Sequence, residues 1–181
     1  MDLQEAIKKR RTIHSFNSVQ VLETTIERAL EEANFAPCYL HTYPWRFTSL
    51  KREKRELLAQ LALELKFEYR SPDEITKATV LKKILNPSHL LVASQVLNAE
   101  PKRKLEDYAA CACAIQNLSL SLVSEGVGSK WSTGKITTHK NTYKIVGIDP
   151  DQEEIIGFLW IGYGEIPPQI KRPLISSIFR R

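Results

Sequence analysis

The chain has 181 residues, of which 43% are hydrophobic and 26% are charged, which are the proportions of an ordinary globular protein. Its net charge of +5 and isoelectric point near 9.1 favour an anionic ligand such as a phosphorylated cofactor. They do not form the dense basic stripe of a protein that binds duplex nucleic acid. We therefore expect one domain over residues 1–181 with a hydrophobic core of its own.

The sequence also carries information on location. Residues Met1–Glu5 lack the charged and then apolar layout of a signal peptide. No apolar run approaches the roughly 18–20 residues that a membrane span needs. The cysteines form no disulfide pattern, and Cys111 and Cys113 are expected on different faces of a helix, which disfavours a shared metal. These features predict a cytoplasmic protein without a membrane partner.

The first half of the chain predicts four helices and one strand. A helix is expected to begin at Thr24, where Thr24–Glu27 has the pattern of a capping box, and Pro37 is expected to stop it. Trp45–Leu50 has the residues of a strand with its aromatic side chains on one side. Apolar spacing and helix-start residues predict three further helices: Leu3–Arg10, Glu53–Tyr69 and Pro72–Leu85.

The second half is dominated by a long helix predicted over Lys104–Glu125, with Gly126 as its left-handed C-terminal residue. The small residues of Ala109–Ala114 indicate either a tightly packed core helix or a helix that crosses its own copy in a dimer, and the sequence leaves both open. Strands are expected at Leu90–Val96, around Trp131 and at Ile155–Gly162, a helix at Lys140–Val146, and an aperiodic tail at Pro167–Arg181. Helices and strands mix without strict alternation, which predicts the α+β class.

Several catalytic motifs are absent from the sequence. It contains no phosphate-binding Gly-x-x-x-x-Gly-Lys-Ser/Thr loop, no Gly-x-Gly-x-x-Gly after a strand and no Gly-x-Ser-x-Gly. The four histidines have no metal-ligand spacing. Cys38 and His41 could form a nucleophilic pair, but no third group is placed to orient them. The charge run Lys51–Glu56 alternates in sign, as on a solvated helix face, which disfavours a nucleic-acid module.

The most distinctive segment is Arg10–Phe16, which brings two guanidinium groups, the Thr12 hydroxyl and the His14 imidazole together where a helix ends. Guanidinium groups bind phosphate oxygens with two parallel hydrogen bonds, and a hydroxyl adds a neutral donor. Basic residues at a helix end also serve simply to complement the helix dipole. The segment alone is therefore compatible with a phosphate site and with plain helix termination.

Four other segments favour the phosphate site, because together with Arg10–Phe16 they resemble the nitroreductase family of FMN-dependent, NAD(P)H-using oxidoreductases. The family begins with a helix running into Arg-Arg-Ser-x-Arg-x-Phe. The further matches are Ala36-Pro37 with Pro44-Trp45, Ala109 to Leu118, Gly126-x-Gly128-Ser129-x-Trp131, and Ile161-Gly162-Tyr163 before a basic tail. The resemblance covers nearly the whole chain and is closest to the compact, single-domain members.

The resemblance implies a three-layer sandwich with a mostly antiparallel sheet, an intertwined homodimer and FMN at the dimer interface. Arg10, Arg11 and Thr12 would hold the FMN phosphate and ribityl chain, with His14 as a further candidate. Lys171, beside Arg172, would close over the phosphate. Phe35 and Tyr39 would approach the flavin from the other subunit, and Trp131, Ser132 and Thr133 would line its ring, largely through backbone groups. No side chain is nominated as a catalytic acid or base, because the flavin carries the chemistry.

The implied reaction is hydride transfer from NADH or NADPH, through flavin N5, to a small acceptor such as a nitroaromatic or a quinone. One region departs from the family pattern: Cys38, His41 and Tyr43 replace the usual Ser, Asn and Gln. The resulting loop is bulkier and more aromatic, which affects the range of substrates more than flavin binding. An alternative hypothesis is therefore a flavin-binding protein with little reductase activity, acting in flavin handling, sensing or specialised metabolism.

Overall fold

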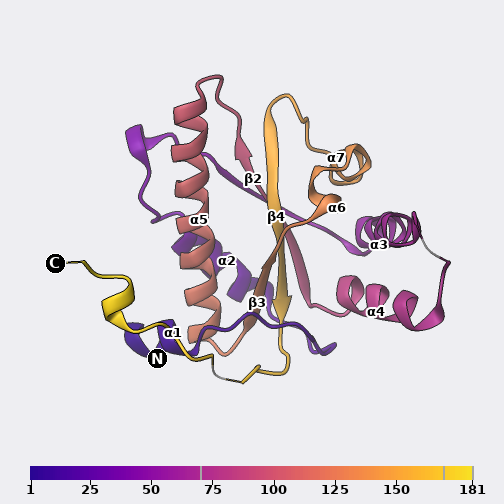
Figure 1. The fold of residues 1–181 in the computed structure, drawn as a ribbon, viewed down its shortest axis with the longest axis horizontal. Coiled ribbons are helices and arrows are strands. Elements are labelled where there is room, and N and C mark those ends of the chain that lie inside the picture. The colour runs from indigo at the N-terminus through magenta and orange to yellow at the C-terminus, as the bar shows by residue number, and fades with distance from the viewer. Residues whose placement is uncertain (70, 169, 181) are drawn as a thin grey trace.

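The structure is a computed structural model, which describes residues 1–69, 71–168 and 170–180. Its centre is a four-stranded sheet in which every neighbouring pair is antiparallel. The order is β1 (Trp45–Ser49), β2 (His89–Val96), β4 (Glu153–Gly162) and β3 (Gly128–Ser132), so β3 is an edge strand. Helices cover both faces (Figure 1). The three layers confirm the predicted α+β sandwich.

One face of the sheet packs against α2 (Glu23–Ala33) and α5 (Pro101–Ser124). Because side chains alternate along a strand, Leu91, Leu159 and Ile161 point to this side, where they meet Ala114 and Leu118 of α5. All five side chains are fully or almost fully buried. This layer therefore forms one half of the core.

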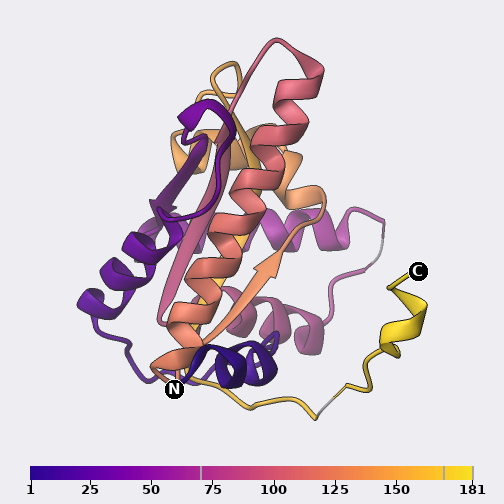
Figure 2. The ribbon, with the colours of Figure 1, turned by 90° about the vertical axis from the view of Figure 1, so that its left-hand side faces the viewer.

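The opposite face is covered by α3 (Arg52–Phe67), α4 (Glu74–Leu85), α6 (Lys135–Thr138) and α7 (Lys140–Val146). The intervening strand residues Leu90, Val92, Phe158 and Trp160 point to this side and pack with Leu58 of α3. Helix α1 (Leu3–Lys9) lies near the C-terminal end of α5, and the short 3₁₀ turns are η1 (Tyr39–His41) and η2 (Ile175–Ser177). Figure 2 shows α1 and η1 near opposite ends of α5.

Half of the small residues in Ala109–Ala114 lie in the core. Ala110, Cys111 and Ala114 are buried against the sheet and α2, whereas Ala112 and Cys113 are half-buried and Ala109 is exposed. The three buried residues fit the core-helix interpretation. Burial raises the pKa of the Cys111 thiol to about 12, with a smaller contribution from the nearby Asp107 charge, so this cysteine is an inert apolar side chain.

Most predicted elements appear within one or two residues, but the predicted capping of α2 and the predicted start of α5 were wrong. Helix α2 begins at Glu23 and no side chain caps it, so the predicted capping box at Thr24–Glu27 does not form. The hydroxyl of Thr25 instead donates to Glu125 across the fold. Helix α5 begins at Pro101, three residues before the predicted start, because proline is well suited to the first turn of a helix. The short helix α6 was not predicted.

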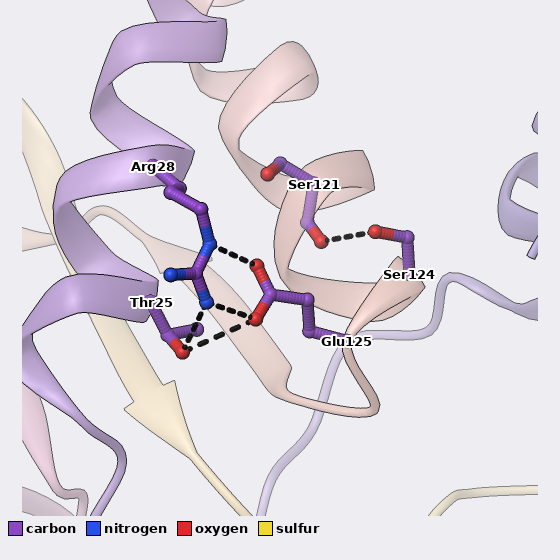
Figure 3. A network of polar contacts seen from close by, with 5 residues as sticks. All are labelled: Thr25, Arg28, Ser121, Ser124 and Glu125. Carbon is purple, nitrogen blue, oxygen red and sulfur yellow. Dashed lines mark hydrogen bonds and ion pairs between the residues drawn. The ribbon is translucent and has the colours of Figure 1, made fainter.

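The partner of Thr25 belongs to a polar network between α2 and the end of α5 (Figure 3). The Arg28 guanidinium makes two bonds to the Glu125 carboxylate, Nε to Oε1 at 3.1 Å and Nη2 to Oε2 at 2.6 Å. Glu125 ends α5, and Gly126 follows it with a φ of +78°, as predicted for the left-handed residue. The network fixes the end of α5 on α2.

Across the residues that the structure describes, no helix has both the length and the apolar character required to cross a membrane. In the same residues, no group of three or more His, Cys, Asp or Glu side chains is arranged to hold a metal ion.

Candidate functional site

The two N-terminal arginines are positioned by the end of α1. Arg10 is the C-terminal cap of the helix, and its backbone N–H donates to the carbonyl of Ala6. The Arg11 guanidinium donates to the carbonyls of Lys8 at 2.9 Å and Arg10 at 3.1 Å, which complements the helix dipole. In the described part of the chain neither arginine forms an ion pair with a carboxylate. Both therefore have charge available for an anionic ligand.

The next residues are tied to the sheet. Thr12 forms a parallel bridge with Ser129 at the start of β3, and Phe16 bridges Gly164 beyond β4. A Cβ atom added at Gly164 would lie 2.2 Å from the Ser15 carbonyl oxygen, so this close approach requires glycine. Residues 12–16 are therefore held in extended form beside β3, with the Thr12 and His14 side chains facing a cavity.

This basic cavity, of about 570 Å³, joins the two ends of the chain. It is lined by Arg10, Arg11, Thr12, His14, Pro167, Pro168, Ile170 and Arg172. Three guanidinium groups, a hydroxyl and an imidazole thus surround one space, which is the donor set that a phosphate requires. The structure brings Arg172 into the lining, whereas Lys171, the predicted tail residue, is exposed and outside it.

A second cavity, of about 500 Å³, lies at the other end of β3, between the sheet and helices α3, α4 and α6. Ser132 and Thr133 line it, together with Lys83 of α4 and a mainly apolar wall that includes Val80 and Phe158. A mostly apolar cavity with a few polar groups is typical of a small-molecule site. The two cavities lie at opposite ends of the same edge strand.

Trp131 points away from this second cavity. Its ring packs on the α5 side of the sheet, 6.4 Å from the ring of Tyr108, and its indole N–H donates to the Ile156 carbonyl at 3.2 Å. Ile156 is the extra residue of a bulge between β2 and β4, because Ala93 pairs with Gly157 and Ser94 with Ile155. Trp131 thus satisfies a bulge carbonyl, and only its backbone remains available to a ligand on the cavity side.

Lys130 of β3 is a further basic residue beside the N-terminal segment, and the sequence did not suggest it. Its Nζ lies 3.5 Å from Nδ1 of His14. Burial lowers the pKa of the Lys130 ammonium, and the positive charge of Lys83 lowers it further. The Lys130 side chain is thus held next to His14, which lines the basic cavity.

The remaining predicted residues, Phe35 and Tyr39, lie elsewhere. Their side chains are 80% and 61% exposed, in and before the loop Cys38–Tyr43, which contacts the N-terminal end of α5. That loop touches α5 at Asp107. The arginine end of the molecule meets α5 sixteen residues further on, where Val123 lines a cavity together with Lys8 and Arg10. Sixteen helical residues span about 24 Å. A single chain thus does not bring Tyr39 to its own basic cavity, whereas Phe35 follows α2, whose Glu32 carbonyl accepts a hydrogen bond from Asn117 in the second half of α5.

The loop Cys38–Tyr43 has an unusual backbone. Leu40, His41 and Tyr43 have positive φ angles of 53°, 55° and 44°, which residues other than glycine rarely adopt. The thiol of Cys38 accepts the Tyr43 N–H at 3.2 Å and lies 3.1 Å from the Thr42 hydroxyl. His41 instead contacts the Tyr43 hydroxyl. Cys38 and His41 thus have different partners, which gives no support to a nucleophilic pair.

Comparisons with known proteins agree with this architecture. The model of the Nitroreductase family matches residues 7–163, a span that contains Arg10–His14, β3 and β4. The chain belongs to the Nitroreductase family. YfhC of Bacillus subtilis strain 168, which is named as an NAD(P)H nitroreductase, is 32% identical over 94% of this chain and 88% of its own length. The resemblance inferred from the sequence is therefore confirmed.

Solved structures share the fold over the whole chain. A nitroreductase-like family protein from Bacillus cereus has a TM-score of 0.84 at 24% identity and covers 100% of this chain and 96% of its own. A nitroreductase from Desulfovibrio desulfuricans, solved in complex with FMN, has a TM-score of 0.76 at 18% identity, with 100% and 97% covered. At these identities the likeness establishes the fold.

Sequence reasoning missed Lys83 and Lys130. Neither belongs to a motif quoted for the family, and isolated lysines on a helix and a strand are usually solvated. A signal for Lys130 was present, however. It alternates with Ser129 and Trp131, so it points to the opposite side of the strand from the Trp131 indole.

Proposed function

We propose that this protein is an FMN-dependent oxidoreductase that transfers a hydride from NADH or NADPH to a small acceptor such as a nitroaromatic or a quinone. The observation that carries the proposal is the basic cavity, in which Arg10, Arg11 and Arg172 meet Thr12 without a carboxylate partner among the described residues. Such a donor set suits a phosphate monoester. The chain's membership of the Nitroreductase family supports the same cofactor.

The residues present fit FMN along β3. The arginines and Thr12 would hold the phosphate at one end, and the second cavity, with Ser132 and Thr133, would take the ring. The apolar wall of that cavity suits an aromatic ring system and excludes water from it. Trp131 would contribute backbone groups only, since its indole N–H is occupied by Ile156. Lys171 would lie over the phosphate from outside, beside Arg172.

The bound flavin would supply hydride transfer at N5, which explains why no side-chain nucleophile or metal site is needed. The chain's own part is to bind, orient and shield. Guanidinium groups fix the phosphate by paired hydrogen bonds. The edge strand β3 would fix the distance between the phosphate end and the ring end of the site, and so hold a bound flavin in one orientation toward donor and acceptor.

We further propose a homodimer in which each site uses both subunits. Tyr39 lies over Arg103 at the end of α5 opposite to the basic cavity, Phe35 follows α2 beside Asn117 of α5, and both aromatic side chains are exposed. Large exposed aromatic side chains mark interaction surfaces. A second copy with its α5 running in the opposite direction would bring its Phe35 and Tyr39 toward the cavity of the first.

The test begins with the purified protein. We expect a yellow protein that releases FMN on denaturation, and bleaching of the flavin band when NADH or NADPH is mixed anaerobically in a stopped-flow instrument. A protein that stays colourless after incubation with FMN contradicts the proposal. Arg10→Ala should raise the Kd for FMN about 10- to 100-fold, from a charge-assisted contact of about 1.5–3 kcal/mol.

A second function is favoured by one observation, the strained aromatic loop Cys38–Tyr43. A flavin-binding protein with little reductase activity would take up FMN with the same affinity. Its flavin would not be bleached by either nicotinamide donor, although dithionite would still reduce it. The same stopped-flow experiment therefore separates the two functions.

A further inference from the structure

A third cavity, of about 510 Å³, lies where α1 meets the end of α5, two elements that contact each other near the bottom of Figure 2. Residues 12–14 separate it from the basic cavity. Side chains alternate along this extended segment, so Thr12 and His14 line the basic cavity, whereas Ile13 lines the third one. The two cavities share the side chains of Arg10 and Arg11. The third cavity has the size of a small-molecule site.

The inner wall of this third cavity is mainly apolar. Ile13 and Val127 line it and are 3% and 2% exposed. Val123 of α5 and Tyr163, which follows β4, are half-buried beside them. The buried hydroxyl of Ser119 donates to a backbone carbonyl one turn earlier in α5, so its hydrogen is already bound. The wall therefore suits an apolar group that leaves water.

The α1 side of the same cavity is basic. Lys8, Lys9, Arg10 and Arg11 line it, and no Asp or Glu of the described chain does. Lys9 pairs with Glu5 at 2.6 Å, but the other three form no ion pair with a carboxylate among the described residues. Arg11 donates to the carbonyls of Lys8 and Arg10, so these helix-end acceptors are covered. An anion would thus meet positive charge here.

We propose that the third cavity binds a small amphipathic anion, with an apolar body and one carboxylate or sulfonate head group. Charge complementarity sets its orientation: the head faces Lys8 and the two arginines, and the body packs on Ile13 and Val123. This site differs from the one proposed for the FMN phosphate, which lies on the Thr12 side of the N-terminal segment. The inference therefore goes beyond the proposed function and does not depend on it.

The experiment uses probes that share one chain and differ in charge. Decanoate is the anion, decanol is neutral and decyltrimethylammonium is the cation, and each is titrated calorimetrically below its micelle concentration. Acetate tests the head group without the body. Lys8→Gln removes a charge at the head, and Val123→Trp fills the cavity. Lys102→Gln is the matched control, because Lys102 is exposed at the other end of α5.

We expect one decanoate to bind per chain, and decanol and the cation to bind about tenfold more weakly or not at all, because several ion contacts are lost together. Acetate should not bind measurably. Lys8→Gln should raise the Kd for decanoate about two- to fivefold, Val123→Trp should abolish binding, and Lys102→Gln should leave it unchanged. Melting temperatures verify folding. If Val123→Trp melts early, Val123→Gln places a polar group against the body and repeats the measurement.

Three results overturn the inference. Equal affinities for decanoate and decanol would show an apolar surface without charge selection. Unchanged decanoate binding in folded Val123→Trp would place the ligand elsewhere. No binding to wild type, together with a monomer–dimer equilibrium that Val123→Trp shifts in sedimentation velocity, would assign the cavity to a second copy of the chain. A failure of the proposed function is distinct, since a protein that takes up no FMN can still bind decanoate.

Discussion

The hydroxyl of Thr42 donates a hydrogen bond to the carboxylate of Asp107, with the two oxygens 2.9 Å apart. Asp107 is 4% exposed on α5, so water has little access to its oxygens and a side-chain donor takes the place of water. Thr42 sits between two residues with positive φ, His41 and Tyr43. This bond thus holds a strained loop on the long helix, and the strain is offset by satisfying a buried acid.

Replacing Thr42 by Val should therefore destabilise the protein. The substitution removes the donor and leaves the Asp107 carboxylate without the hydrogen bond that it has now, at a cost of about 1–3 kcal/mol. Urea unfolding should show a lower midpoint with an unchanged slope. Thr42→Ser keeps the hydroxyl and is the matched control. Equal midpoints for the Val and Ser variants would show that the bond contributes nothing.

The two adjacent tail residues should differ in their effect on FMN affinity. Arg172 lines the basic cavity and Lys171 does not. Arg172→Ala is therefore expected to raise the Kd for FMN by about 10- to 100-fold, from a lost charge-assisted contact of about 1.5–3 kcal/mol. Lys171→Ala should produce a smaller change. Fluorescence titration of both variants measures the order, and a larger effect at Lys171 would contradict the geometry.

The Arg28–Glu125 pair should make stability depend on acid pH. The hydrogen bonds that Arg28 donates hold the pKa of the Glu125 carboxyl below its ordinary value of 4.5. A carboxyl whose pKa is lowered on folding stabilises the native state above the unfolded pKa, and this contribution is lost as the pH falls through the folded pKa. The melting temperature of wild type should thus exceed that of Glu125→Gln at pH 6, and the difference should shrink below pH 4.5.

The same melting measurement tests Arg28, the partner of Glu125. Arg28→Gln should remove the same difference at pH 6, and the double variant should melt no lower than the weaker single variant, because the two side chains act through one interaction. High salt should reduce the effect, since both groups are largely exposed. A difference between wild type and Glu125→Gln that persists unchanged at pH 3 contradicts the assignment.

Gly157 should tolerate no side chain. A Cβ atom there would lie 2.1 Å from Nε1 of Trp131, the atom that donates to Ile156. Gly157→Ala must therefore displace the indole and break this hydrogen bond, which leaves a buried bulge carbonyl unpaired at a cost of about 1–3 kcal/mol. Thermal unfolding and the tryptophan fluorescence spectrum report the change. Ala93→Gly, on the paired residue of β2, controls for general disturbance of the strands.

The strands and long helices followed from local pattern. In an apolar run such as Leu90–Val96 or Ile155–Gly162, both faces of the strand must be buried, which requires a central place in the sheet. The structure places both runs centrally, in β2 and β4. The start of α2 could not be predicted in the same way. Thr25 had a plausible local role as part of a capping box, but its hydroxyl bonds Glu125, one hundred residues away, a competition that no local pattern reveals.

The residues of the candidate site also differ in how far the sequence could predict them. Arg10, Arg11 and Thr12 could be recognised because they are neighbours in sequence as well as in space. The charge of Lys83 on α4 acts on Lys130 of β3 only in the folded chain, so the spacing of the two lysines in the sequence carries no signal. The Trp131 indole lies on the α5 side because side chains alternate along β3, but its hydrogen-bond partner, the carbonyl of bulge residue Ile156, is not visible in hydrophobic alternation.

The basic cavity is lined from both parts of the chain, by Arg10, Arg11, Thr12 and His14 and by Pro167, Pro168, Ile170 and Arg172, and this sets an order of events during synthesis. Arg10 and Arg11 leave the ribosome before any strand of the sheet has been synthesised. More than 150 further residues are added before Arg172 is available to complete the cavity. The central sheet and both halves of the core can assemble in that interval. The anion-binding wall is thus completed only after all four strands have been synthesised, and we expect an anionic ligand to enter a chain whose core can already be folded.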